Sequence, residues 1–225
     1  GGPATSLTTT TGNIEIVGAG ITAGKNGLYF HYDVDISTAD GDISIIASGG
    51  GFNTGGTPTT QNITSTNGNI TIKASALGIQ NMNSISAGDT LSIFTIDPTT
   101  TIGIGTGSTG ILNLLNSELA ILDAGNKIII GENGVQRSYV DINAWDMSTT
   151  SFDLEVYGRS ISMGGIDMGE GSILAHAQNN GLDGNYLVVD GNIQRTANGV
   201  ATLDLRSDHE IQIMSANIIA NDADS

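Results

Sequence analysis

Pairs of aspartates two positions apart are the first residues in this sequence whose type and spacing could do chemistry. Asp40 and Asp42 flank Gly41, and Asp33 and Asp35 alternate along an expected strand. A glycosidase needs two carboxyl groups about 5–10 Å apart across a groove, and alternate residues on one strand face could meet that distance. Aspartate beside glycine is also ordinary turn chemistry. We interpret these pairs as turn and surface residues, and a polysaccharide lyase or hydrolase is the alternative.

The other groups that such an enzyme requires are scarce. His31, His176 and His209 lie far apart in the sequence, and the chain has only 7 lysine and arginine residues. A polysaccharide lyase needs a cationic side chain that pairs with the uronate carboxylate of its substrate. Serine and aspartate occur throughout this chain, so finding a histidine that could complete a Ser-His-Asp triad is no evidence for one. We therefore predict that the protein is not an enzyme, and we assign no catalytic residue.

Calcium is the one metal for which the sequence offers ligands. Asp-Gly-Asn or Asp-Gly-Asp turns place Asp40, Asp42, Asp183 and Asp190 as oxygen donors. The glycine-rich nonapeptide of calcium rolls and the twelve-residue helix-loop-helix pattern are both absent. We expect ordinary Asx turns and no cofactor, with calcium at these four aspartates as the alternative.

Aromatic side chains are few, and one group of them interrupts the repeat pattern described below. Tyr139, Trp145, Phe152 and Tyr157 fall within 19 residues and include the only tryptophan. Large rings supply much of the energy at the centres of interfaces. The sequence predicts a contact surface here, and the alternative is that the rings pack inside an irregular coil.

A recurring sequence cassette predicts the strands and turns that must position these residues. It consists of glycine, then asparagine or aspartate, then a strand that alternates with isoleucine. Copies begin at Gly12, Gly41, Gly68, Gly88 and Gly125. The steps between them are 29, 27, 20 and 37 residues. Repeats of roughly 20–50 residues are typical of solenoids, and strand–turn–strand units without helices indicate a β-solenoid.

Alternation with a period of two predicts an all-β parallel β-helix in which Ile14, Ile43, Ile70 and Ile72 point inward. We attribute the cassette glycines to tight turns that need a positive φ. Residues 116–122 are the one stretch that could turn helically. The domain prediction is a single β-helix over residues 1–225 with an irregular, aromatic-richer insertion around 135–163.

Composition excludes several classes of function. The formal net charge is −16, from 23 acidic and 7 basic residues, so nucleic-acid binding is not expected. There is no cysteine for a disulfide or thiolate site, and no apolar run approaches the ~20 residues of a membrane span. The chain opens with Gly1-Gly2-Pro3 rather than methionine. We interpret it as a processed product or a segment of a larger protein.

The cassettes resemble repeats of the filamentous haemagglutinin-like adhesins of Gram-negative bacteria. Similar modules include Gly110-Ile111-Leu112-Asn113-Leu114 with Ile128-Ile129-Ile130-Gly131, and the stretch over residues 199–213. The resemblance covers most of the chain apart from about 135–185. It implies a right-handed parallel β-helix shaft, export by two-partner secretion and a role in adhesion, with no transferable catalytic residues. The family's secretion domain carries an Asn-Pro-rich signature that is absent from this chain. The resemblance therefore implies that the chain belongs to the shaft or the tip of such an adhesin.

These observations together predict a structural or adhesive segment of a secreted, extracellular bacterial cell-surface protein. Its expected partners are a host or neighbouring-cell receptor or glycan. Bare sheet edges at both ends would also permit end-to-end self-association. The alternatives are the polysaccharide-active enzyme and an ice-binding solenoid. The latter is suggested by threonines at 8–11 and 99–101, although these fall in breaks of the pattern rather than in regular ladders.

Overall fold

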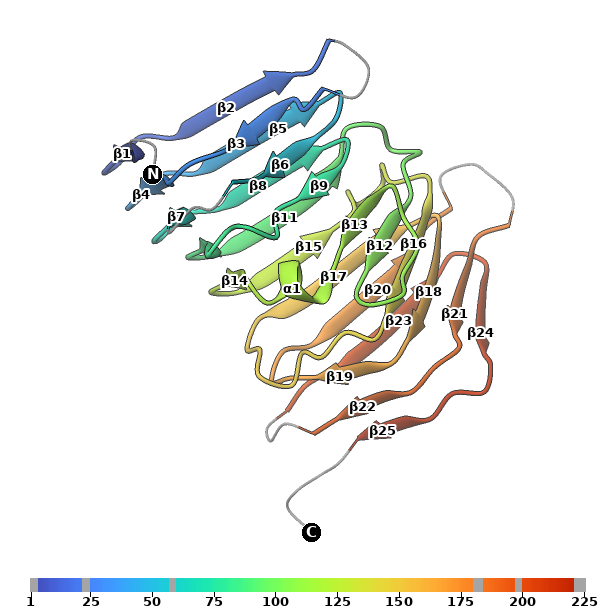
Figure 1. Ribbon diagram of the computed structural model, residues 1–225. Coiled ribbons are helices and arrows are strands. Elements are labelled where there is room, and N and C mark those ends of the chain that lie inside the picture. Colours follow the sequence, from blue (N-terminus) through green and yellow to red (C-terminus); the bar gives the residue numbers. More distant parts are fainter. Residues whose placement is uncertain (1–3, 22–24, 57–59, 180–183, 197–199, 221–225) are drawn as a thin grey trace. The chain divides into compact units, whose positions relative to one another are not determined.

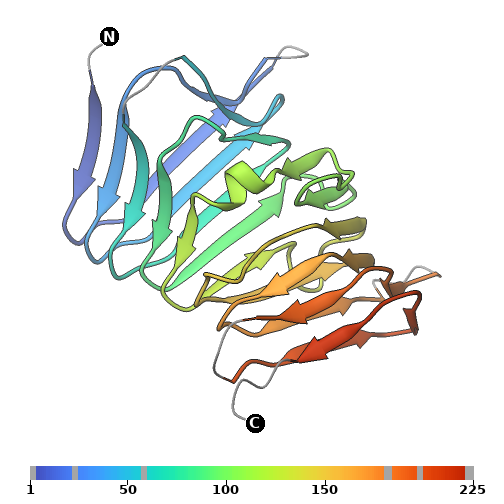
Figure 2. The same cartoon turned by 60° about the horizontal axis from the view of Figure 1, so that its bottom comes forward.

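The computed structural model describes residues 4–21, 25–56, 60–179, 184–196 and 200–220. The chain divides into two compact units, residues 1–97 with 117–128, and residues 98–116 with 129–225. Figures 1 and 2 show the strands of these units in chain-order colours. Among the described residues, no helix has the length and apolar character needed to cross a bilayer.

The first unit is built from coils whose strands alternate among three sheets, and its first three coils have one strand in each. β1, β4, β7, β10 and β14 form one sheet, β2, β5, β8 and β11 are neighbours in a second, and β3, β6 and β9 form a third. Successive strands along the chain therefore turn from sheet to sheet, and each coil stacks on the one before it. The bounds are β1 (Thr5–Thr9), β2 (Ile14–Ala19), β3 (Leu28–Phe30), β4 (Val34–Thr38), β5 (Ile43–Ser48), β6 (Phe52–Thr54), β7 (Gln61–Ser65), β8 (Ile70–Ala74), β9 (Leu77–Gly78), β10 (Ser84–Ala87), β11 (Thr90–Thr95) and β14 (Leu122–Ala124).

Parallel register places equivalent residues of successive cassettes above one another. Ile14 pairs with Ile43, Ile43 with Ile70, and Ile70 with Leu91. Ile14, Ile43, Ile70 and Ile72 are all buried, which confirms the predicted inward ladder. Burial of a large aliphatic side chain is worth about 1.5–3 kcal/mol, so these ladders hold the unit together.

The cassette glycines are required for a different reason from the one expected. Gly41 and Gly68 are not among the residues with positive φ. A Cβ on Gly41 would lie 2.2 Å from the Gly12 carbonyl oxygen, and one on Gly68 would lie 2.3 Å from the Gly41 oxygen. The turns of neighbouring coils approach too closely for any side chain. The positive-φ explanation is therefore wrong for these glycines, and backbone contact between coils replaces it.

The second unit repeats the three-strand coil. Its sheets follow the orders β13-β12-β16-β18-β21-β24 and β19-β22-β25, and β17, β20 and β23 are neighbours in a third sheet. The division between the units falls within β15 (Lys127–Ile130). The bounds are β12 (Ile102–Ile104), β13 (Leu112–Leu114), β16 (Tyr139–Asn143), β17 (Asp153–Gly158), β18 (Ser160–Gly164), β19 (Ile166–Met168), β20 (Ile173–Ala177), β21 (Tyr186–Val189), β22 (Ile193–Arg195), β23 (Leu203–Ser207), β24 (Glu210–Ile213) and β25 (Ile218–Ala220).

The segment around 135–163, expected to be an irregular insertion, is largely part of the sheets. β16 pairs in parallel with β18, and β17 pairs in parallel with β20. The stretch between β16 and β17, residues 144–152, is the longest part of the segment outside named strands. Aliphatic residues such as Val140, Leu154 and Ile161 fill the interior, so regular coils persist although the cassette sequence is lost.

The fold is all-β, a parallel β-helix as predicted. Every strand pairing that defines the sheets above runs parallel, from β1 with β4 to β22 with β25. The short α1 (Asn116–Leu119) lies within the stretch that the sequence analysis marked as able to turn helically. The coil architecture thus follows from alternating apolar residues and glycine turns.

Candidate binding surfaces

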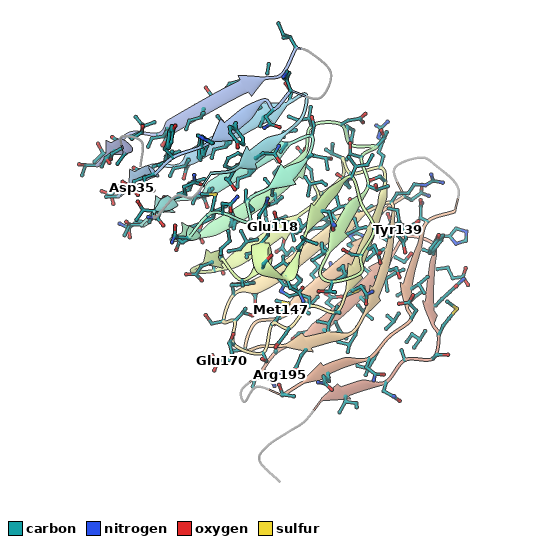
Figure 3. All side chains as sticks on the ribbon, in the orientation of Figure 1. Asp35, Glu118, Tyr139, Met147, Glu170 and Arg195 are labelled. Carbon is teal, nitrogen blue, oxygen red and sulfur yellow. The ribbon has the colours of Figure 1, made fainter. Side chains whose placement is uncertain are left out.

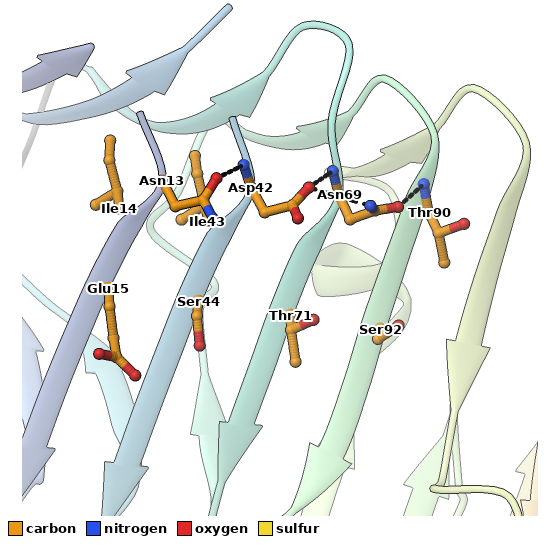
Figure 4. Close-up of a pocket in the computed structure, with 10 residues that line it drawn as sticks. All are labelled: Asn13, Ile14, Glu15, Asp42, Ile43, Ser44, Asn69, Thr71, Thr90 and Ser92. Atoms are coloured by element: carbon orange, nitrogen blue, oxygen red, sulfur yellow. Dashed lines mark hydrogen bonds between the residues drawn. The ribbon is translucent and has the colours of Figure 1, made fainter. Parts of the chain in front are cut away.

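Polar side chains at the start of β2, β5, β8 and β11 form a hydrogen-bonded ladder (Figure 4). The Asp42 N–H donates to Asn13 Oδ1 at 2.9 Å, and the Asn69 N–H donates to Asp42 Oδ1 at 2.8 Å. The Thr90 N–H donates to Asn69 Oδ1 at 3.2 Å. Each side chain thus satisfies a backbone donor of the next coil. The asparagine or aspartate of the cassette is needed as an acceptor between coils.

A second ladder uses hydroxyl groups three residues before the cassette glycine. The Thr38 hydroxyl donates to the Gly12 carbonyl at 3.2 Å and accepts from the Gly41 N–H at 3.0 Å. Ser65 repeats this one coil later, donating to the Gly41 carbonyl at 2.7 Å and accepting from the Gly68 N–H at 3.0 Å. Both hydroxyls are buried. The spacing of threonine or serine before glycine was visible in the sequence and was not used.

The outer face of β2, β5, β8 and β11 carries a shallow hollow of about 540 Å³ beside the first ladder. Glu15, Ser44, Thr71 and Ser92 stand opposite one another across its strands. Short hydroxyl side chains dominate this row, and its one charged member is Glu15. Such a face can hydrogen-bond to water or to a polar partner, but it offers no nucleophile–base pair.

The aspartates proposed as catalytic or calcium-binding residues serve as hydrogen-bond acceptors between strands. Asp40 accepts from Asn67 Nδ2 at 2.8 Å, and Asp190 accepts from the Ser162 hydroxyl at 3.2 Å. Asp42 belongs to the first ladder, and Asp183 lies outside the described residues. Within the part of the chain that the structure describes, no three acidic or histidine residues gather as a metal site.

The other catalytic candidates are also dispersed. Asp33 accepts from the Thr60 N–H at 3.0 Å. His176 Nε2 lies 3.0 Å from Asp208 Oδ1 on the outer surface. The Asn179 N–H and then His176 lower the pKa of Asp208 below its ordinary value by hydrogen bonding. This pair stabilises a surface contact between β20 and the turn after β23.

Buried polar groups can also mark functional sites, and Glu118 in α1 is one of them (Figure 3). Its Oε1 accepts the Ile79 N–H at 2.7 Å, so the carboxylate meets a backbone donor that would otherwise be buried without a partner. This contact fixes the chain after β9. We therefore assign Glu118 a structural role.

Three of the four predicted contact aromatics are buried. Trp145 is 4% exposed, Phe152 3% and Tyr157 6%. This burial corrects the contact-surface interpretation for these three residues. Tyr157 is on the outer face of β17, where its hydroxyl donates to Glu155 Oε2 at 2.9 Å and its ring lies beside that of His176.

The exposed aromatic group is a different one, which the sequence analysis missed. Tyr29 is 49% exposed and Tyr32 51%, and His31 between them is also exposed. The Tyr29 and His31 rings stack with centroids 5.7 Å apart, and His31 meets Tyr32 edge-on at 4.6 Å. We call these three residues the aromatic trio. Tyr32 follows the end of β3 at Phe30 and is exposed to solvent.

Tyr139, the fourth predicted aromatic, lines a hollow of about 500 Å³ in the second unit (Figure 3). Two arginines, Arg137 and Arg159, share this hollow with it. Burial raises the pKa of Tyr139, and a hydrogen bond with Ser162 opposes part of that rise. We call this site the arginine–tyrosine hollow, and its lining is Arg137, Ser138, Tyr139, Arg159, Ser160, Gly184 and Tyr186.

Comparison with known proteins gives no relative: no family model, curated protein or solved structure shows a significant match to this chain. The resemblance to filamentous haemagglutinin-like adhesins therefore rests on the cassette residues alone.

Proposed function

We propose that this chain is a structural and adhesive segment of a large bacterial surface protein. In this proposal the protein reaches the cell surface of a Gram-negative bacterium by two-partner secretion and acts without enzymatic chemistry. The observation that supports this proposal most directly is the pair of side-chain hydrogen-bond ladders between successive coils. The acceptor and hydroxyl positions repeated in successive cassettes stabilise the stacking of the coils and leave short polar groups on the outer face.

The aromatic trio is the surface that best fits a partner of such a segment. Tyr29 and Tyr32 are each about half exposed beside His31. Tyrosine combines a flat apolar face with a polar hydroxyl and loses little entropy on binding. A host or neighbouring-cell receptor or glycan is the proposed partner.

The test is attachment of beads that carry the purified chain to cultured epithelial or bacterial cells. We expect saturable attachment that soluble chain competes away and that Tyr29→Ala with Tyr32→Ala reduces. Val17→Ala is the matched control, because it removes an exposed apolar side chain elsewhere in the same unit. Absence of saturable attachment to any cell type would refute the adhesive function, and an equal loss in the Val17 variant would refute the role of the trio.

A further inference from the structure

Two tyrosines flank a small serine in the arginine–tyrosine hollow. Tyr139 on β16 pairs with Ser160 on β18. The next residues, Ile161 and Leu187, are paired, so Ser160 in turn stands opposite Tyr186 on β21. With a strand spacing of about 4.8 Å, the backbones of the two tyrosines are about 10 Å apart. Tyr186 is 38% exposed, so its ring is accessible to a ligand in this hollow.

The arginine–tyrosine hollow also has two cationic side chains, although the chain as a whole is acidic. Two of the 7 lysine and arginine residues, Arg137 and Arg159, line it. Arg137 is exposed, and its guanidinium makes no hydrogen bond or ion pair within the described part of the chain. Its backbone is fixed, because its N–H donates to the Pro98 carbonyl at 2.8 Å and the buried Gln136 beside it donates to the Thr100 carbonyl at 2.9 Å. The backbone that carries this cation is therefore fixed beside the hollow, while the guanidinium remains available to a ligand.

Neighbouring carboxylates limit how much negative charge the hollow can accept. Glu210 on β24 is paired with Tyr186 and is exposed. Asp141 lies beside Tyr139 and accepts the Thr109 N–H at 2.8 Å, and Asp190 accepts from Ser162. A polymer with several anionic groups on each sugar would be repelled by these carboxylates, whereas a glycan with one carboxylate per sugar could direct one of them at Arg137.

From these contacts we propose that the arginine–tyrosine hollow binds a carboxylate-bearing sugar of an acidic glycan. Arg137 pairs with the carboxylate, for which the planar guanidinium offers two parallel donors. The faces of Tyr139 and Tyr186 pack on the sugar ring, and the Ser160 hydroxyl lies between them. This inference names a ligand class for the proposed adhesive function and rests on that function for its biological meaning, but binding is measurable without it.

The experiment measures binding of trigalacturonate to the whole chain by calorimetry at physiological salt. We expect saturable binding that Arg137→Gln and Tyr186→Ala each weaken about tenfold or more, about 1.4 kcal/mol, with Tyr186→Phe retaining most of the affinity. Arg206→Gln is the matched control, because it removes an equal charge from the same unit where Arg206 pairs with Asp204. The methyl-esterified trimer should bind at least about tenfold more weakly than the acid.

Four results would overturn the proposal. These are no binding of trigalacturonate, an equal loss in Arg206→Gln, competition by acetate at the same concentration, or equal or tighter binding of an oligoglutamate or a heparin fragment. Circular dichroism of each variant separates lost binding from lost folding. If bead attachment persists while trigalacturonate fails to bind, the site is refuted and the adhesive function stands. If the sugar binds while attachment is absent, the site stands and the adhesive function is refuted.

Discussion

At the scale of single residues, the exposed fraction of an aromatic side chain decides whether it can contact a partner or packs within the protein. The sequence predicts Trp145 and Phe152 as contact residues because large rings supply much of the energy at interface centres. The large apolar area of these rings also favours burial, and both are buried in the structure. Tyr29 and Tyr32 remain outside because they flank the end of β3 on the surface of the first unit.

Trp145→Ala should destabilise the protein by about 3–5 kcal/mol, because it leaves a cavity where a ring that is 4% exposed now packs. Tyr29→Ala, at a half-exposed ring, should change the free energy of unfolding by less than about 1 kcal/mol. Urea denaturation followed by circular dichroism measures both. Unchanged stability with lost attachment in the Trp145 variant would instead restore the contact interpretation.

Tyr157 should ionise well above the ordinary pKa of a tyrosine side chain. Desolvation by burial, and then its hydrogen bond to Glu155, raise the pKa of Tyr157 from 10.0 to about 12. Because the folded pKa lies above the unfolded one, this contribution to stability is complete below pH 10 and is lost as pH rises through about 12.

The measurement is unfolding by urea between neutral pH and pH 12, with tyrosinate absorbance recorded in parallel. Tyr157→Phe should remove part of the alkaline loss of stability and delete the step of the absorbance titration near pH 12. A titration in which that step remains in the Tyr157→Phe protein would assign the raised pKa to another tyrosine.

At the scale of the element, the residues of the cassette stabilise the stacking of one coil on the next. Its hydroxyl, glycine and acceptor positions each contact the neighbouring coil, through the Thr38 and Ser65 bridges and the ladder from Asn13 to Thr90. A hydrogen bond of this kind contributes only about 0.5–1.5 kcal/mol, so repetition rather than any single bond makes the unit stable. Glycine is the least replaceable position.

Gly68→Ala should lower stability by about 1–3 kcal/mol or more, because its Cβ would lie 2.3 Å from the Gly41 oxygen and force the coils apart. Gly134→Ala is the control, since Gly134 has a φ of +74° but no atom within 4 Å of the added Cβ. Its cost should be limited to the left-handed conformation, about 1–2 kcal/mol. Urea midpoints that rank the two variants in the opposite order would contradict the close-contact explanation.

At the scale of the whole molecule, the net negative charge and the small number of cations favour a structural or binding role over catalysis. A net charge of −16 keeps a repeat protein soluble and discourages non-specific association. The one hollow proposed for an acidic sugar has Tyr139 as a candidate base, and burial raises the pKa of this tyrosine. Little tyrosinate is therefore available at neutral pH.

Incubation with pectin or alginate should release no product above the buffer background, whether measured as reducing ends or as unsaturated uronate absorbance. The physical reason is that binding by Arg137 and stacking by two rings supplies neither an ionised base nor an acid opposite it. Catalytically dead controls are Tyr139→Phe and Asp42→Asn. Product formation that either substitution abolishes would show that the protein is an enzyme.

The sequence by itself determined the parallel β-helix, the inward isoleucines and the short helical turn, because alternation and repeat length are local properties of the chain. It also contained the spacing that places Thr38 and Ser65 before their glycines. Only the tertiary structure decided which aromatics are exposed, why Gly41 and Gly68 must be glycine, and which residues meet in the arginine–tyrosine hollow. Those features depend on contacts between coils about 20–30 residues apart, and their register is set by the stacked strands rather than by neighbours in sequence.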